Sequence, residues 1–318
     1  MVSWREKYTM PEVLEEFEIS NPYLHDADCL NRRFHQDGYL FFRGVLDPKE
    51  VEQVKREFVQ ILQEQGVVQR GCSEPVWTGL GLEHIDDTPL YRLSSYDDIL
   101  ESATTMGLLE RLFQGPVFRY RNTDIRFALP NDERHLTPPH QDHFFVRESD
   151  QFRTAWVPLM SIGVDAGPLA IAKHSHRMGL LDHVEHETAY SYIFRGRKQR
   201  GVPMDRLQGP WLTTEYAPGD LLLFHSLSVH RALPNRSGRI RLSLDGRFQL
   251  LASPRTWQSQ QTILELREYR KEVQRLATAE GATEPVFEAL MIEMMKRGLK
   301  AEAGSVRAVM AELSRGPG

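Results

Sequence analysis

Residues 218–248 read PGDLLLFHSLSVHRALPNRSGRIRLSLDGRF, and this stretch decides the fold. Its two strand-like runs lie at residues 221–224 and 240–248. A turn signal precedes each run: Pro218-Gly219-Asp220 before the first and Pro234-Asn235 before the second. Because the second turn can fold its strand back beside the first, the stretch predicts antiparallel β-structure.

Short β-type runs continue through the middle of the chain. Further examples lie at residues 124–128, 152–159 and 167–171. Many short strands within one unit predict a sandwich or a jelly-roll barrel. We place this core at residues 117–250, with a long polar insertion at 172–218.

Helical patterns flank the predicted core on both sides. On the N-terminal side, residues 1–116, we expect a short helix near 11–17, a strand at 39–42, a helix from Pro48 to about residue 65, a lid loop at 66–98 and a helix at about 97–114. Asp47 and Pro48 suit the N-cap and first position of the first long helix. On the C-terminal side, residues 257–316 carry two apolar stripes at helical spacing. We therefore expect a mainly β fold with flanking helices (α+β), built as a single catalytic domain over residues 1–318.

Composition argues against several classes of protein. The chain has 318 residues, of which 41% are hydrophobic, with a formal net charge of -5 and a pI near 6.2. This balance gives no indication of binding to nucleic acid or to a membrane. Cys29 and Cys72 lie far apart and suggest no disulfide framework. Residues 1–17 are charged and lack the apolar segment of a signal peptide, and no apolar run approaches the length of a membrane span. We expect a cytoplasmic protein.

One tripeptide has the residue types of a metal site. His140-Gln141-Asp142 follows a pair of prolines, and His230 lies ninety residues beyond His140. Two imidazoles and one carboxylate can hold ferrous iron on one face and leave the other face open. The run Phe144-Phe145-Val146 looks like a strand, and on a strand residues 140 and 142 would point to the same side. The pattern predicts an iron site formed by His140, Asp142 and His230.

Two alternatives compete for these ligand positions. His35-Gln36-Asp37 is an identical tripeptide, but it lies where a helix-like segment turns at Gly38, so its aspartate suits the turn. His225 follows the same strand as His230 and could instead be a core histidine or a neighbour of the metal site.

An arginine after the second histidine suggests a carboxylate-binding site. Arg241 and Ser243 share one face of the predicted strand. A guanidinium and a hydroxyl together suit one carboxylate of 2-oxoglutarate. Arg239 is the competing arginine on the same strand.

At this point the chain resembles the phytanoyl-CoA dioxygenase-type Fe(II)/2-oxoglutarate oxygenases, over residues 34–249. The resemblance rests on the segments Asp37-Gly38-Tyr39, Gly44-Val45-Leu46, Trp156-Val157-Pro158-Leu159, Ala166-Gly167-Pro168-Leu169 and 219–225, besides the candidate ligands. It implies a double-stranded β-helix (a jelly-roll, cupin-like barrel) with Fe(II), 2-oxoglutarate and O2 as cofactor and cosubstrates. It also implies that His140, Asp142 and His230 bind iron, that Arg241 and Ser243 bind 2-oxoglutarate, and that Trp156 lies near it. Two positions depart from the family pattern: residues 172–176 read AKHSH, and Ala232 replaces a frequent hydroxyl residue.

The resemblance further implies a hydroxylase that oxidises an unactivated C–H bond of a small metabolite or natural-product intermediate. Related halogenating enzymes lack the carboxylate, which is present here as Asp142. Desaturation, cyclisation and epimerisation share the same chemistry and stay open. The alternatives are a non-catalytic sensing barrel that binds metal and a metalloenzyme that does not use 2-oxoglutarate.

Substrate contacts are predicted from a few side chains. Several basic residues near the predicted strands and in the insertion could bind an anionic group: Arg119, Arg121, Arg126, Arg195, Arg197, Lys198 and Arg200. Arg126 is the preferred one, because it lies on the strand before the HQD motif. Trp77, Tyr91 and Phe144 are the other substrate candidates. We expect no nucleic-acid or membrane partner, and a C-terminal tail that braces the barrel or forms a homodimer contact.

Overall fold

The computed structural model describes residues 13–146, 151–190, 198–207 and 209–315, and divides them into two compact units. The first unit covers residues up to 119 together with 124–252. The second comprises residues 120–123 and 253 onward.

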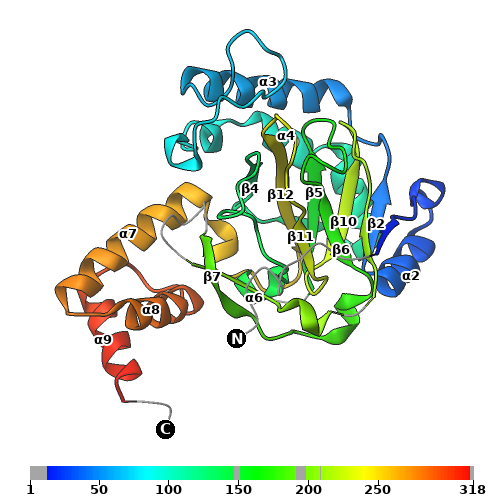
Figure 1. The fold of residues 1–318 in the computed structure, drawn as a ribbon. Coiled ribbons are helices and arrows are strands. Elements are labelled where there is room, and N and C mark those ends of the chain that lie inside the picture. The colour runs from blue at the N-terminus through cyan, green and yellow to red at the C-terminus, as the bar shows by residue number, and fades with distance from the viewer. Residues whose placement is uncertain (1–12, 147–150, 191–197, 208, 316–318) are drawn as a thin grey trace. The chain divides into compact units, whose positions relative to one another are not determined.

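The first unit contains a large antiparallel sheet. Its strands follow the order β2-β10-β5-β12-β3, and β4 pairs with β12 beside β3. The bounds are β2 (Tyr39–Phe42), β3 (Val117–Arg119), β4 (Asp124–Ala128), β5 (Arg153–Pro158), β10 (Leu221–His225) and β12 (Arg241–Leu250). Figure 1 shows β12, β5, β10 and β2 side by side. The sequence predicted that the second strand folds back directly beside the first. In the structure β5 lies between β10 and β12 and pairs with both.

A smaller sheet faces the large one. Its order is β1-β9-β6-β11, with β1 parallel to β9 and the other pairs antiparallel. The bounds are β1 (Leu14–Glu16), β6 (Leu169–Ala172), β9 (Trp211–Thr213) and β11 (His230–Ala232). A single buried cluster joins side chains of both sheets, including Trp156 and Leu222 from the large sheet and Ile171 and Leu212 from the small one. The predicted jelly-roll fold is therefore confirmed, although the described strands of this core form two facing sheets and not one closed barrel.

The polar insertion at 172–218 contributes structure of its own. β7 (Val184–Tyr190) and β8 (Lys198–Gly201) form a separate antiparallel hairpin, and β9 joins the small sheet. Arg195 and Arg197 lie outside the described residues.

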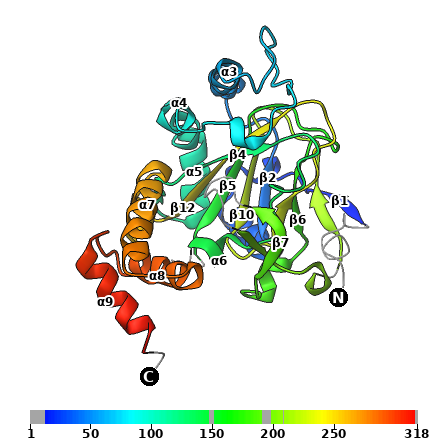
Figure 2. The same cartoon turned by 60° about the vertical axis from the view of Figure 1, so that its left-hand side comes forward.

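Helices of the first unit only partly follow the sequence prediction. They are α2 (Ala27–Asp37), α3 (Pro48–Glu64), α4 (Ser95–Leu100) and α5 (Ala103–Phe113). Asp47 caps α3 as predicted, since its side chain accepts a hydrogen bond from the Lys49 amide. The single helix predicted at 97–114 is wrong, because the Ser102 side chain accepts from the Thr105 amide and starts a new helix there. Figure 2 shows α3, α4 and α5 after a turn about the vertical axis.

Three further local predictions were wrong. Residues 14–16 of the predicted helix at 11–17 form strand β1, while residues 11 and 12 lie outside the described part. α2 was predicted only as a helix-like segment before Gly38, and its start at Ala27 was missed because its mostly polar surface buries only Leu30 and Phe34. The strand expected after the HQD motif is a short helix, α6 (Asp142–Val146).

The second unit is helical, as predicted for the tail. α7 (Ile263–Ala279), α8 (Glu284–Lys296) and α9 (Ala303–Leu313) share an apolar cluster that includes Val273, Leu290 and Val306. A capping box of Thr262 and Glu265 begins α7. That both units act as one catalytic domain stays a prediction. In the described residues, each helix is too short or too polar to cross a bilayer.

Candidate metal centre

The two candidate histidine ligands are brought together by the backbone. The amide of His140 donates to the carbonyl of His230 at 2.9 Å, and the amide of His230 donates back at 3.0 Å. This bridge holds the two imidazole rings with their centroids 4.2 Å apart. His230 begins β11 and Asp142 begins α6, so a loop, a strand and a helix together supply the three side chains.

The three ligand atoms converge on one point. Nε2 of His140 lies 3.7 Å from Oδ1 of Asp142, and Nε2 of His230 lies 3.8 Å from the same oxygen. All three side chains are buried, and they form a group that could hold a metal ion. Both distances are shorter than twice a usual ligand–metal bond of about 2.1 Å, and the three ligand atoms all lie within 4.8 Å of one another, as in a group that could hold one metal ion. The donor set of two nitrogens and one oxygen fits ferrous iron.

A hydrogen bond from Nδ1 to a backbone carbonyl fixes the tautomer of each histidine. Nδ1 of His140 donates to the carbonyl of Pro138 at 2.9 Å, and Nδ1 of His230 donates to that of Ser228 at 3.0 Å. A carbonyl can only accept, so each Nδ1 carries the proton and each Nε2 presents its lone pair to the metal. Burial lowers the pKa of His230 to about 3, assisted by the neighbouring His140, which keeps the imidazole neutral.

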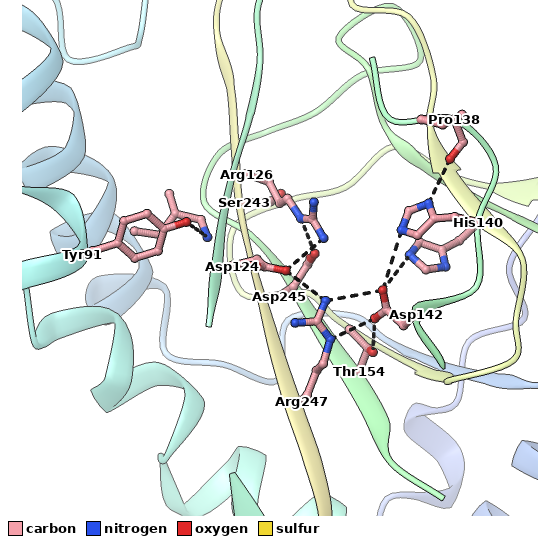
Figure 3. A network of polar contacts seen from close by, with 12 residues as sticks. Tyr91, Asp124, Arg126, Pro138, His140, Asp142, Thr154, Ser243, Asp245 and Arg247 are labelled. Carbon is pink, nitrogen blue, oxygen red and sulfur yellow. Dashed lines mark hydrogen bonds and ion pairs between the residues drawn. The ribbon is translucent and has the colours of Figure 1, made fainter. Parts of the chain in front are cut away.

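Asp142 is held by two polar partners (Figure 3). Oγ1 of Thr154 donates to its Oδ2 at 2.7 Å, and Nε of Arg247 lies 3.3 Å from the same oxygen. Burial alone would raise the pKa of Asp142, but the Arg247 guanidinium and the two imidazoles outweigh it and hold that pKa well below its usual range. The carboxylate is therefore ionised, as a metal ligand must be.

Arg241 and Ser243 lie together on the same face of β12. Arg241 is buried; its Nε donates to the carbonyl of Gly167 at 3.1 Å and its Nη1 to Oγ of Ser243 at 2.6 Å. Arg241 lines a pocket together with Arg126, Leu129, His135 and Asn235. The guanidinium thus carries a fixed positive charge in a recess that can take a carboxylate.

The residues that were alternatives to Arg241 and to the metal ligands lie outside the site. Arg239 is partly exposed and pairs with Glu74 at 3.1 Å. The His225 ring stacks on Phe34, with its Nδ1 accepting from the Leu227 amide, and it is not part of the buried metal-ligand group. Asp37 ends α2 beside Arg33, as expected for an aspartate that serves a helix end.

Trp156 lies in the core. It is fully buried, and its ring packs against Tyr216 with the centroids 4.6 Å apart. It does not line the pocket that contains Arg241. The predicted contact between Trp156 and 2-oxoglutarate stays a prediction.

The predicted substrate residues are separated in the structure. Arg126 lines the pocket with Arg241, but it also pairs with Asp245 at 2.5 Å and Asp124 at 3.2 Å. Tyr91 is buried, and its hydroxyl accepts from the Ile125 amide at 3.3 Å, beside β4.

The other two candidates are aromatic. Trp77 is partly buried and donates through Nε1 to the Leu80 carbonyl at 2.8 Å. Phe144 stacks on His183 with the centroids 4.0 Å apart, and the Arg200 guanidinium lies 5.4 Å from the centre of its ring. Neither residue lines the pocket.

Three polar residues around the metal ligand were missed by the sequence prediction: Asp124, Thr154 and Arg247. A signal for Arg247 was present, since residues 241, 243, 245 and 247 alternate along one strand and share its face. Thr154 and Asp124 carried no such signal, because only the pairing of β4 and β5 with β12 brings them close.

Comparison with known proteins supports this picture. The model of the phytanoyl-CoA dioxygenase (PhyH) family matches residues 34–243. Two curated relatives are called 1-deoxypentalenic acid 11-beta-hydroxylase: that of Streptomyces arenae is 32% identical and that of Streptomyces exfoliatus 31%, each alignment covering 77% of this chain and 89% of the relative.

Solved structures share the fold. The non-heme monooxygenase ThoJ has a TM-score of 0.51 at 18% identity, covering 71% of this chain and 79% of its own. The epimerase SnoN, in complex with Fe3+, alpha ketoglutarate and nogalamycin RO, has a TM-score of 0.50 at 22% identity, covering 70% of this chain and 83% of its own.

The fold, the buried His-Asp-His group and the related hydroxylases together define a non-haem Fe(II)/2-oxoglutarate-dependent oxygenase. The chain belongs to the phytanoyl-CoA dioxygenase (PhyH) family. The predicted family, enzyme class and cofactors are confirmed.

Proposed function

We propose that this oxygenase hydroxylates an unactivated C–H bond of a small, carboxylate-bearing natural-product intermediate. The observation that carries the proposal is the buried group of His140, Asp142 and His230, together with a pocket that contains Arg241. The names of both Streptomyces relatives describe hydroxylation of a carboxylic acid, 1-deoxypentalenic acid. The net reaction consumes one O2 and one 2-oxoglutarate and yields the alcohol, succinate and CO2.

Each predicted group has a place in this reaction. His140, Asp142 and His230 hold Fe(II), which together with 2-oxoglutarate supplies the oxidising chemistry. Arg241, with Ser243 at 2.6 Å, binds the far carboxylate of 2-oxoglutarate. The protein contributes orientation and the exclusion of water, for which a buried ligand set and a narrow pocket are suited.

The pocket wall suits a hydrocarbon with one charged end. Leu82, Phe127, Leu129 and Leu136 supply apolar surface, and the cation Arg126 lines the same pocket. We propose that Arg126 attracts the carboxylate of the substrate while it keeps its ion pairs with Asp124 and Asp245. Trp77, Tyr91 and Phe144 stay predictions as substrate contacts; Tyr91 would act by fixing the position of β4.

The test is substrate-dependent succinate release from the iron-loaded enzyme. We expect 1-deoxypentalenic acid or a related terpenoid acid to stimulate release, and its methyl ester to do so with a much higher KM. In Arg126→Ala, the KM for the acid should approach that for the ester, with kcat less affected. Equal KM values for acid and ester in the unsubstituted enzyme would contradict recognition of the carboxylate.

Two other functions are separated by the same assay. Turnover without 2-oxoglutarate would indicate a metalloenzyme of another kind. Binding of iron and 2-oxoglutarate without turnover on any acid in a broad panel would indicate a sensing barrel.

We also infer a cytoplasmic location and a homodimer contact through the C-terminal helices. Cys29 and Cys72 are both free thiols, which fits a reducing compartment. Partly buried apolar side chains such as Leu276, Leu299 and Leu313 border the apolar cluster of the second unit and could be covered by a second copy. Sedimentation of the whole chain tests this: a monomer at micromolar concentration would exclude the dimer.

A further inference from the structure

A buried chain of charges leads away from the candidate metal ligand Asp142 (Figure 3). Arg247 lies against Asp142, with Nε 3.3 Å from Oδ2 and Nη2 3.4 Å from Oδ1. The same Nη2 donates to Oδ2 of Asp124 at 2.9 Å. Arg126 then joins Asp124 to Asp245. All these side chains except Arg126 are almost completely buried.

The two carboxylate oxygens of Asp142 have different partners. Oδ2 accepts from Thr154 at 2.7 Å and from Nε of Arg247. Oδ1 faces Nε2 of both histidines, at 3.7 and 3.8 Å. Its hydrogen bond with Arg247, at 3.4 Å, is longer than either hydrogen bond to Oδ2. A carboxylate can rotate about its Cβ–Cγ bond, so two donors on Oδ2 select the rotation that turns Oδ1 toward the histidines.

Arg247 is itself held in place. Its planar guanidinium spans two aspartates, and β12 fixes its backbone between β4 and β5. Burial lowers the pKa of Arg247, but Asp142, Asp124 and Asp245 outweigh it and raise that pKa above its usual value, so the cation is permanent.

We propose that Arg247 is a positioning residue for the metal: it orients Asp142 so that the three-ligand site exists before iron binds. The proposal rests on the assignment of His140, Asp142 and His230 as iron ligands. Partners that orient a ligand typically contribute about 10- to 100-fold to metal affinity. Arg247 should therefore set the affinity for Fe(II) even when neither substrate nor 2-oxoglutarate is present.

The experiment measures the Kd for Fe(II) by anaerobic competition with a chromophoric chelator. The variants are Arg247→Gln, Arg247→Lys and, as the matched control, Arg126→Gln. Arg126 is the other guanidinium of the same network, but its ion pairs are with Asp124 and Asp245. Loss of either arginine leaves buried aspartates with fewer partners, so both variants carry a similar cost for folding.

We expect Arg247→Gln to weaken Fe(II) binding by about 10- to 100-fold. Arg247→Lys keeps the charge without the planar two-point contact and should fall between Arg247→Gln and the unsubstituted protein. Arg126→Gln should stay within about threefold of the unsubstituted protein, because the carboxylate of Asp142 is still held. Circular dichroism identifies any variant that does not fold. If Arg247→Gln does not fold, the Kd of Arg247→Lys is compared with that of the unsubstituted protein instead.

Three outcomes contradict the proposal: unchanged affinity in Arg247→Gln, unchanged affinity in Arg247→Lys where Arg247→Gln does not fold, or the same loss in Arg126→Gln as in the Arg247 variants. Failure of the unsubstituted protein to bind iron is a different result, because it would overturn the metal centre itself.

Discussion

Acid should destabilise the metal-free protein through histidines that are buried without charge. The pKa of His230 is lowered to about 3, first by burial and then by His140, and the pKa of His225 is lowered to about 3, first by burial and then by Arg153. In the unfolded chain both would titrate near pH 6.5. His176 is shifted in the same direction, mainly by burial.

The sign and the size follow from proton linkage. Between about pH 6.5 and pH 3 the unfolded state binds protons that the folded state does not, so stability is full above pH 6.5 and falls as the pH falls. Each fully shifted histidine contributes about 1.4 kcal/mol per pH unit. His225 and His230 together should therefore remove on the order of 3 kcal/mol between pH 6 and pH 5, a large part of a typical folding free energy.

The assay is urea unfolding with a chelator present at pH 7, 6 and 5, followed by tryptophan fluorescence, because Trp156 and Trp211 are buried in the first unit. His225→Asn removes one titrating ring and leaves an oxygen that can accept from the Leu227 amide. Its slope of stability against pH should be smaller by about 1.4 kcal/mol per pH unit. His84→Asn is the control for the replacement of a histidine as such, because the His84 side chain is half exposed. Equal slopes in His225→Asn and the unsubstituted protein would refute the linkage.

Three further substitutions test the cosubstrate site and the fold. Arg241→Ala should weaken 2-oxoglutarate binding by roughly 10- to 100-fold, because it removes hydrogen bonds from a charged donor. Unchanged affinity in an equilibrium titration would exclude that role for Arg241. The control is Arg239→Ala, because the Arg239 side chain is partly exposed and pairs with Glu74. Leu222→Ala should cost about 2–5 kcal/mol in urea unfolding, because it empties part of the cluster between the two sheets; a cost below 1 kcal/mol would contradict the shared core. Gly38→Ala should lower Tm by several degrees, because Gly38 has φ 78° and a Cβ there would lie 2.3 Å from Nδ1 of His176; an unchanged melting curve would contradict this close approach.

The sequence predicted which three candidate ligands come together better than it predicted the structure around them. His140, Asp142 and His230 are distinctive residue types at a distinctive spacing, and the short strands of the core carry strong local patterns. The strand expected at Phe144–Val146 was wrong because a short apolar run does not distinguish helix from strand. Only strand pairing brings Thr154 to Asp142 and Asp124 to Arg247, and this pairing involves residues far apart in the sequence. Long-range contacts of this kind leave no local pattern.

The arginines show the same limit. Arg126 was proposed from its place before the HQD motif, but its pairing with Asp245 depends on the register between β4 and β12. Alternation along a strand puts Arg239 and Arg241 on the same face, so the sequence could not separate them. The structure places Arg241 in the pocket, and Arg239, which precedes β12, beside Glu74. Alternation along a strand thus predicted that Arg241 and Ser243 share a face, while the choice between the arginines and their ion-pair partners required the tertiary structure.

The most direct test is an anaerobic titration of the metal-free protein with Fe(II) and then 2-oxoglutarate, recorded in the visible range. The proposed site predicts a charge-transfer band of the iron–2-oxoglutarate chelate, absent in His140→Ala and requiring much more 2-oxoglutarate in Arg241→Ala. Well-folded protein that binds iron but develops no band would contradict the binding of iron and 2-oxoglutarate at this centre.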